Sequence, residues 1–274
     1  MVADGPCNSQ ENLSCKQSRE VTNQIDWDCE VYRNYADSNL GCRERVSSGI
    51  SWAFEHVNEA IILEDDCLPD VSFFRYCENL LNYYRHDKRV MVISGNNFQD
   101  GCWRGDGSYY FSYYPHCWGW ATWKRAWEKY DNSLSKWHKF KQTNLLSSLF
   151  SNHQEVQYWT SIFDQIKSQN TPDTWDYCWA YSCWINSGLT ILPNVNLVKN
   201  IGFGDLSTNT RDAQNPFADL DVKTITNEIN HPSFVVRDQI ADSYTFEQMF
   251  KRNSFRHLLL KKIARLTRTV QRIV

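Results

Sequence analysis

EAIILEDDCLP, residues 59–69, places three acids directly after an apolar run. The run Ile61 to Leu63 has the continuous apolar character of a buried strand. Glu64, Asp65 and Asp66 follow it without a break. Adjacent carboxylates repel one another, and burial increases that repulsion. We therefore expect a positive group to compensate these acids.

The segments around this stretch alternate between helical and extended patterns. Apolar residues recur at helical intervals over 40–57 and again over 71–86. A second short buried strand is indicated at 89–97. This alternation predicts an α/β domain with a mostly parallel central sheet flanked by helices. Acids that follow a strand then lie at the end of the sheet where such domains bind ligands.

The pattern is weaker beyond residue 100, and the predicted organisation follows from it. Helices are expected over 120–130, 154–168 and 176–186, with extended segments over 189–203. We expect a domain over 1–204, a polar, loop-rich extension over 205–250, and a basic amphipathic helix over 251–274.

Composition excludes several classes of protein. No run of eighteen apolar residues and no leader pattern is present, which predicts a cytoplasmic location. The ten cysteines form no CxxC pair and no zinc-type spacing, so we expect them to be reduced thiols. The net charge of −3 hides an acidic body, because the last 24 residues carry eight Lys or Arg and no acid.

The basic C-terminal segment has two possible roles. Phe255, Leu259, Ile263, Leu266 and Val270 fall on one helical stripe, with most of the cations off it. Such a helix rests peripherally on the inner face of an anionic membrane, or it packs on its own domain. Both interpretations stay open. Nucleic acid is not expected as a partner, since the body is acidic and carries no recognised binding module.

The acids at 64–66 suit a hard divalent cation. Mg²⁺ or Mn²⁺ takes one or two carboxylates and completes its shell with water and phosphate oxygens. On an extended chain Glu64 and Asp66 share a face, while Asp65 points away. The alternative is a solvated acidic turn before a helix that Asp70 or Ser72 caps.

Several ordered blocks resemble one family. NLGCRERVSSGISWAFE, IILEDDCLPDVSFFRYCENLL, ISGNNF, YPHCWGWATWKRAWEKYD and ILPNVNLVKNIGFG are similar to blocks of the hemolytic-protein-like (HlpA-like) bacterial family of nucleotide-diphospho-sugar transferases. These enzymes have the GT-A fold, which is Rossmann-like. The blocks at 64–66 and 119–120 are also distantly similar to the N-glycan alpha-mannoside beta-N-acetylglucosaminyltransferase.

The resemblance implies roles for individual residues. Glu64, Asp65 and Asp66 take the place of the metal-binding motif, with Asp66 as the direct ligand. Asp4 matches an acid that contacts the uracil or ribose, and Gly41 and Arg45 match the start of a helix beneath the nucleotide. Gly119 and Trp120 match a turn that shapes the donor and acceptor pocket.

Asp176 matches the catalytic base of the N-glycan enzyme. Its neighbours Trp175 and Tyr177 are aromatic and are expected to desolvate it, which raises the pKa of a carboxyl. The alternative is an acid at a helix N-terminus, favoured by the helix dipole. Further pocket candidates, on position alone, are Asn96, Asn97 and His116.

The implied function is a metal-dependent glycosyltransferase that uses a UDP- or GDP-linked sugar and Mn²⁺ or Mg²⁺. It is expected to be inverting and to act on a surface-glycan or lipid-linked acceptor. Relatives begin with a further strand and helix before the ADGP segment at 3–6, so the first strand of the sheet is expected to be missing. The rival functions are a truncated, non-catalytic binding or scaffold protein and, from the family label and the basic tail alone, a membrane-perturbing protein.

Overall fold

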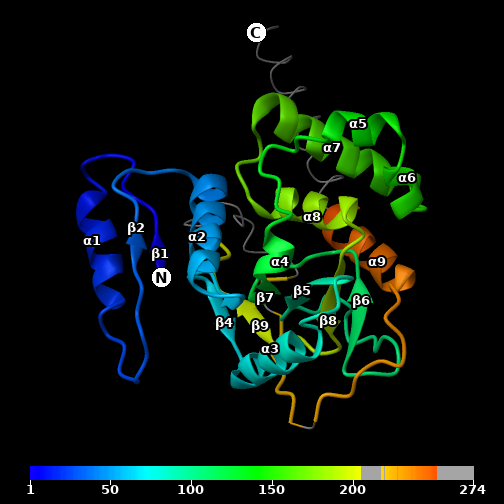
Figure 1. Ribbon diagram of the computed structural model, residues 1–274, viewed down its shortest axis with the longest axis horizontal. Helices are drawn as coiled ribbons and strands as arrows, with labels where there is room; N and C mark the ends of the chain where they lie inside the picture. The colour runs from blue at the N-terminus through cyan, green and yellow to red at the C-terminus, as the bar shows by residue number, and fades with distance from the viewer. Residues whose placement is uncertain (205–216, 219, 227, 252–274) are drawn as a thin grey trace, which may run out of the picture.

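The computed structural model describes residues 1–204, 217–218, 220–226 and 228–251 of the 274-residue chain (Figure 1). The basic helix predicted over 251–274 lies outside these residues apart from Lys251.

A five-stranded sheet forms the centre of the protein, in the order β3-β7-β5-β8-β6. Three of its four strand pairs are antiparallel, and only β5 and β8 run parallel. The strands are β3 (Glu59–Ile62), β5 (Val90–Ser94), β6 (Tyr109–Ser112), β7 (Trp120–Trp123) and β8 (Leu189–Pro193).

The protein is therefore a mixed α/β structure, but the predicted mostly parallel sheet is wrong for the described strands. The difference comes from β6 and β7, two strands that the sequence pattern did not indicate. β7 lies between β3 and β5 and is antiparallel to both. The predicted helix over 120–130 is a strand followed by a single helical turn, α4 (Lys124–Trp127). Every residue of β7 is buried, so its apolar residues show no alternation that would distinguish a strand from a helix.

Two small sheets lie beside the main one. β1 (Val2–Ala3) pairs in parallel with β2 (Asn34–Tyr35), and α1 (Asn12–Val21) connects them. β4 (Cys67–Pro69) pairs antiparallel with β9 (Val198–Asn200). In Figure 1, α1, β1 and β2 lie to one side of the body, next to α2 (Cys42–His56). β1 and β2 make no ladder with the five-stranded sheet.

Most of the predicted helices are confirmed. α2, α3 (Val71–Tyr83), α7 (His153–Gln169) and α8 (Asp176–Ile185) fall within three residues of their expected ends. Asp70 caps α3, because its carboxylate accepts the backbone N–H of Ser72 at 2.8 Å. Two short helices, α5 (Trp137–Gln142) and α6 (Leu146–Leu149), were not foreseen.

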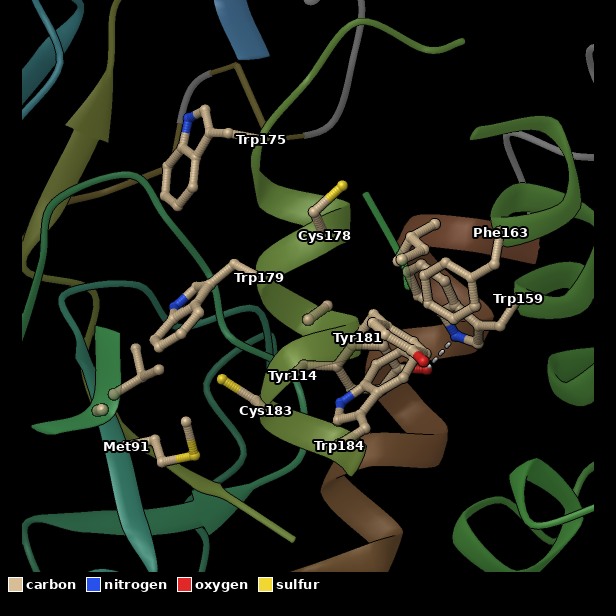
Figure 2. Close-up of a cluster of buried hydrophobic side chains, with 14 of the residues drawn as sticks. Met91, Tyr114, Trp159, Phe163, Trp175, Cys178, Trp179, Tyr181, Cys183 and Trp184 are labelled. Carbon is tan, nitrogen blue, oxygen red and sulfur yellow. Dashed lines mark hydrogen bonds between the residues drawn. The ribbon is translucent and has the colours of Figure 1, made fainter. Parts of the chain in front are cut away.

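The sheet lies between two helical layers. On one face, α3 packs on Val90, Ile93 and Ala121 through Phe73, Cys77 and other buried residues. On the other face, α8 packs on Met91 and Trp120 through its own aromatic residues. Figure 2 shows this second cluster, with Trp175 at the start of α8 and Trp184 at its far end. The heavy aromatic content of the sequence therefore goes largely into the core.

The described part of the extension also packs on this core. α9 (Gln239–Thr245) continues into a π-helical turn, η1 (Phe246–Lys251), and Phe246 joins the cluster around α8. No helix in the described ranges combines the length and the apolar character that a bilayer crossing needs.

Candidate functional site

The acids at 64–66 follow β3 and precede β4, at one end of the central sheet. Glu64 and Asp66 are partly buried, whereas Asp65 is exposed. This is the sidedness that alternation along an extended chain predicts. Glu64 and Asp66 can therefore act together, and Asp65 stands apart from them.

Glu64 is held by an indole. The Nε1–H of Trp175 donates to Oε1 of Glu64 at 3.3 Å. Burial, with smaller contributions from the charges of Asp66 and Asp176, raises the pKa of Glu64 to about 7. The bond from Trp175 opposes this rise, because it stabilises the charged form.

Asp66 lies against the segment that follows β9. The side-chain amide of Asn200 donates to its Oδ2 at 3.2 Å, and the backbone N–H of Ile201 donates to its carbonyl at 2.8 Å. A Cβ on Gly202 would lie only 2.4 Å from Oδ2. Gly202 therefore forms a cradle for the carboxylate that no larger residue would leave open.

Asp176 is the first residue of α8, where the helix dipole favours a negative charge. The hydroxyl of Thr174 donates to its Oδ1. Burial raises the pKa of Asp176, and the Thr174 bond opposes that rise. The preceding residue, Trp175, is 1% exposed and stacks on Trp120 with ring centroids 5.3 Å apart. The aromatic setting expected from the sequence is present, and Trp175 also reaches Glu64.

The negative charges of the three carboxylates affect the pKa values of the same neighbouring groups. The charges of Asp66 and Asp176 both raise the pKa of Glu64. Burial raises the pKa of the Cys117 thiol, and the charges of all three acids add to that rise. Among the described residues, no Lys or Arg forms a salt bridge with Glu64, Asp66 or Asp176. The positive group expected from the sequence to neutralise these acids is therefore not a Lys or Arg ion pair within the described residues.

The donor chemistry at this end of the sheet fits a hard divalent cation. Within the described ranges, no three His, Cys, Asp or Glu side chains are grouped closely enough to hold a metal ion. Mg²⁺ and Mn²⁺ do not need such a group, because they bind through one or two carboxylates and complete their shell with water and phosphate. Asp66 in its Gly202 cradle and Glu64 beside it offer hard oxygen ligands in an acidic setting.

The three residues that the resemblance assigns to nucleotide binding already have structural contacts within the chain: two form hydrogen bonds and one caps a helix. The carboxylate of Asp4 accepts the backbone N–H groups of Gly5, Leu40 and Gly41 and the amide of Asn39. Gly41 is the N-cap of α2, with φ of 82°. Arg45 donates to the carbonyl oxygens of Ala3 and Asn34. These contacts give all three a structural role, and their contact with a nucleotide stays a prediction.

The two asparagines of the pocket assignment are buried. Asn97 is 7% exposed and donates to the Pro193 carbonyl at 2.7 Å. Asn96 is fully buried, and its Oδ1 accepts the backbone N–H of Trp118 at 3.1 Å. Both therefore shape the backbone around the site.

His116, Gly119 and Trp120 are buried as well. Burial lowers the pKa of His116 to about 3, so its ring is neutral at physiological pH. Trp120 is 1% exposed. Gly119 has φ of 71°, and a Cβ there would lie 2.7 Å from Val198. It permits β7 to begin close to β9.

Two partly exposed aromatic residues near the acids were not singled out from the sequence. Trp118 and Phe203 make an edge-to-face contact with centroids 5.4 Å apart. Each follows a residue that borders the carboxylates, namely Cys117 and Gly202. The blocks containing CWGW and IGFG were both noted in the sequence, but only the structure shows which aromatic ring in each remains accessible.

Comparison with models of known protein families gave no match, and comparison with curated proteins gave none either. The resemblance to nucleotide-sugar transferases therefore stays a prediction that rests on the sequence blocks alone.

Proposed function

We propose that this protein is a metal-dependent glycosyltransferase that moves a sugar from a UDP- or GDP-linked donor to a surface-glycan or lipid-linked acceptor. The observation that carries the proposal is the convergence of Glu64, Asp66 and Asp176 on common neighbours, with no described cation paired to them. Such a site favours a positive ligand when its acids are ionised, and a divalent ion that carries a diphosphate is a ligand of this kind.

Each acid has a separate role in the proposed reaction. Asp66, with Glu64 beside it, would hold Mn²⁺ or Mg²⁺, which when bound neutralises the charge that develops on the departing diphosphate. Asp176 would accept the proton of the acceptor hydroxyl, as its raised pKa favours. Thr174 orients that carboxylate through its hydrogen bond. Direct attack from the face opposite the leaving group gives inversion at the sugar carbon.

The finer fold assignment belongs to the same proposal. We infer a GT-A relationship from the sequence blocks, and the position of the acids directly after β3 agrees with the place of the metal-binding motif in those blocks. A cytoplasmic location completes the proposal, with the basic segment 251–274 either on the inner face of the membrane or packed on its own domain.

The test is nucleotide binding by calorimetry, with UDP and GDP in the presence and absence of Mn²⁺. Wild-type protein should bind one of them only with the metal. Asp66→Asn should reduce that affinity at least about tenfold. Glu78→Gln is the control, because it removes a charge from an exposed position of α3 and should leave binding unchanged.

Asp176→Asn separates binding from catalysis. It should keep metal-dependent nucleotide affinity and lower the slow release of free nucleotide from nucleotide sugars by about 10²-fold or more. Undiminished release would reject Asp176 as the base. Absence of any metal-dependent binding in the wild type would reject the transferase and favour the scaffold protein, and vesicle leakage caused by residues 251–274 would favour the membrane-perturbing protein.

A further inference from the structure

Trp118 and Phe203 border the acids from two different parts of the chain. Trp118 directly precedes Gly119, where a Cβ would lie 3.3 Å from Leu63, the residue before Glu64. Phe203 directly follows Gly202, which lies against the Asp66 carboxylate. The two rings meet edge to face, with centroids 5.4 Å apart and planes at 90°. They form one aromatic wall next to the carboxylates.

The backbone on both sides of this wall is fixed by hydrogen bonds. The N–H of Trp118 donates to the buried Asn96 side chain at 3.1 Å, and its ring packs at 5.5 Å on the buried Phe98. The N–H of Gly202, next to Phe203, donates to the side chain of Asn200 at 2.8 Å. The rings are therefore held in place before any ligand arrives.

The two stacked indoles beside the acids are not accessible in the same way. Trp120 and Trp175 are each 1% exposed and are stacked on one another in the core. Trp118 and Phe203 keep a partly exposed side chain. Trp118 and Phe203 are therefore partly exposed rings on the two segments that border the acids.

A ring wall next to carboxylates suits a ligand that is apolar on one side and rich in hydroxyl groups at its edge. A pyranose has this character, because its axial C–H groups form an apolar face and its hydroxyls donate to carboxylates. We propose that Trp118 and Phe203 form the pyranose subsite, with the C–H face of the sugar on the rings and its hydroxyls toward the acids. This inference rests on the proposed transferase function and identifies the part of the site that holds the sugar.

The test uses saturation-transfer NMR with the methyl glycosides of glucose, galactose and N-acetylglucosamine, in the presence of UDP or GDP and Mn²⁺. Ring C–H protons of at least one glycoside should receive saturation from the wild-type protein. Phe203→Leu and Trp118→Leu keep apolar bulk but remove the aromatic face, and each should lower the signal about fivefold. Phe203→Tyr should retain it.

The control is Trp103→Leu, which removes an indole that is 61% exposed and lies outside this wall. Far-ultraviolet circular dichroism of each variant confirms that the fold is intact. Equal signals from the wild type and both leucine variants, or no signal for any glycoside, would overturn the proposal.

The same samples separate this proposal from the transferase itself. Nucleotide binding with Mn²⁺ is measured in parallel by calorimetry. If no nucleotide binds but glycoside signals still depend on Phe203, the transferase proposal fails and the pyranose subsite stands. If nucleotide binds and the signals do not depend on either ring, the subsite fails and the transferase stands.

Discussion

Gly202 controls the room available to the Asp66 carboxylate. A Cβ at this position would lie 2.4 Å from Oδ2 and 2.7 Å from Cβ of Asp66, closer than any stable contact. Gly202→Ala should therefore displace the Asp66 side chain and reduce Mn²⁺ affinity at least about tenfold. The free energy of unfolding should fall by only about 1–3 kcal/mol, the usual cost of local overpacking.

Manganese relaxation enhancement and urea denaturation measure the two effects of this substitution. Ile201→Ala is the control, since Ile201 is 58% exposed and belongs to the same segment. Unchanged Mn²⁺ affinity in Gly202→Ala would show that Asp66 is not a metal ligand.

For single residues, the sequence predicted on which face of the chain an acid lies better than it predicted which side chains are buried. Alternation along the chain correctly separated exposed Asp65 from Glu64 and Asp66. It could not show that Asn96 and His116 are buried, because exposure depends on contacts between distant segments. The bond from Trp175 to Glu64 spans 111 positions in the sequence and likewise left no local pattern.

At the scale of elements, Arg45 fastens the first two strands to α2. Its guanidinium donates to Ala3 on β1 and to Asn34 on β2. Arg45→Lys keeps the charge but loses the planar fork, so the small sheet should loosen. Amide hydrogen exchange at Ala36, whose N–H donates to Ala3 at 3.1 Å, should accelerate about tenfold or more, while exchange in β8 should not change.

Arg75→Lys is the matched control for this substitution. Arg75 donates to a single distant carbonyl, that of Ile225, and lies away from the small sheet. If Arg45→Lys instead lowers nucleotide affinity and leaves exchange at Ala36 unchanged, Arg45 serves the nucleotide rather than the sheet.

Amphipathic helices were predicted from their apolar stripe, and the buried strands β5 and β8 from their apolar runs, whereas β6 and β7 were not predicted. α2, α3 and α7 carry an apolar stripe and were found from it. β6 and β7 are buried at every position, so their sequences lack the two-residue alternation of a half-exposed strand. The direction of the sheet depends on these two strands, which is why its parallel character was overestimated.

At the scale of the whole molecule, two buried glutamates make stability depend on pH. Burial raises the pKa of Glu64 and of Glu155 to about 7 each. Glu155 accepts the Tyr114 hydroxyl and lies near the charges of Asp242, Arg237 and Glu247. Between the unfolded pKa near 4.5 and pH 7, the folded state binds more protons than the unfolded chain. Stability should therefore fall as pH rises through this window and level off above it. The buried ring of His116, whose pKa burial lowers to about 3, acts in the opposite direction below pH 6.5 and makes the net fall smaller than the two glutamates alone would give.

Thermal unfolding between pH 5 and pH 8 tests this dependence. The wild type should melt about 5 °C lower at pH 8 than at pH 5.5. Glu155→Gln keeps an acceptor for Tyr114 but cannot ionise, so it should remove a large part of that difference. Glu55→Gln, on an exposed position of α2, should leave it unchanged. A melting temperature that rises toward pH 8 would contradict the assignment of a raised pKa to these groups.

The layered α/β architecture followed from the order of apolar segments, whereas the strand order did not. The apolar run at 61–63 and the segment 89–97 were recognised as strands, but β7 separates them in the sheet. Which strands become neighbours is decided by long-range packing, such as that of Trp120 against α8. No local pattern in the chain contains that information.

The stacked indoles of Trp120 and Trp175 provide an intrinsic spectroscopic reporter. Their centroids are 5.3 Å apart and their planes differ by 21°, so their electronic transitions couple. The Nε1–H of Trp175 donates a hydrogen bond to Glu64, and a change of charge on that carboxylate shifts the coupled transition. Near-ultraviolet dichroism can thus follow events beside Glu64 in the unlabelled protein.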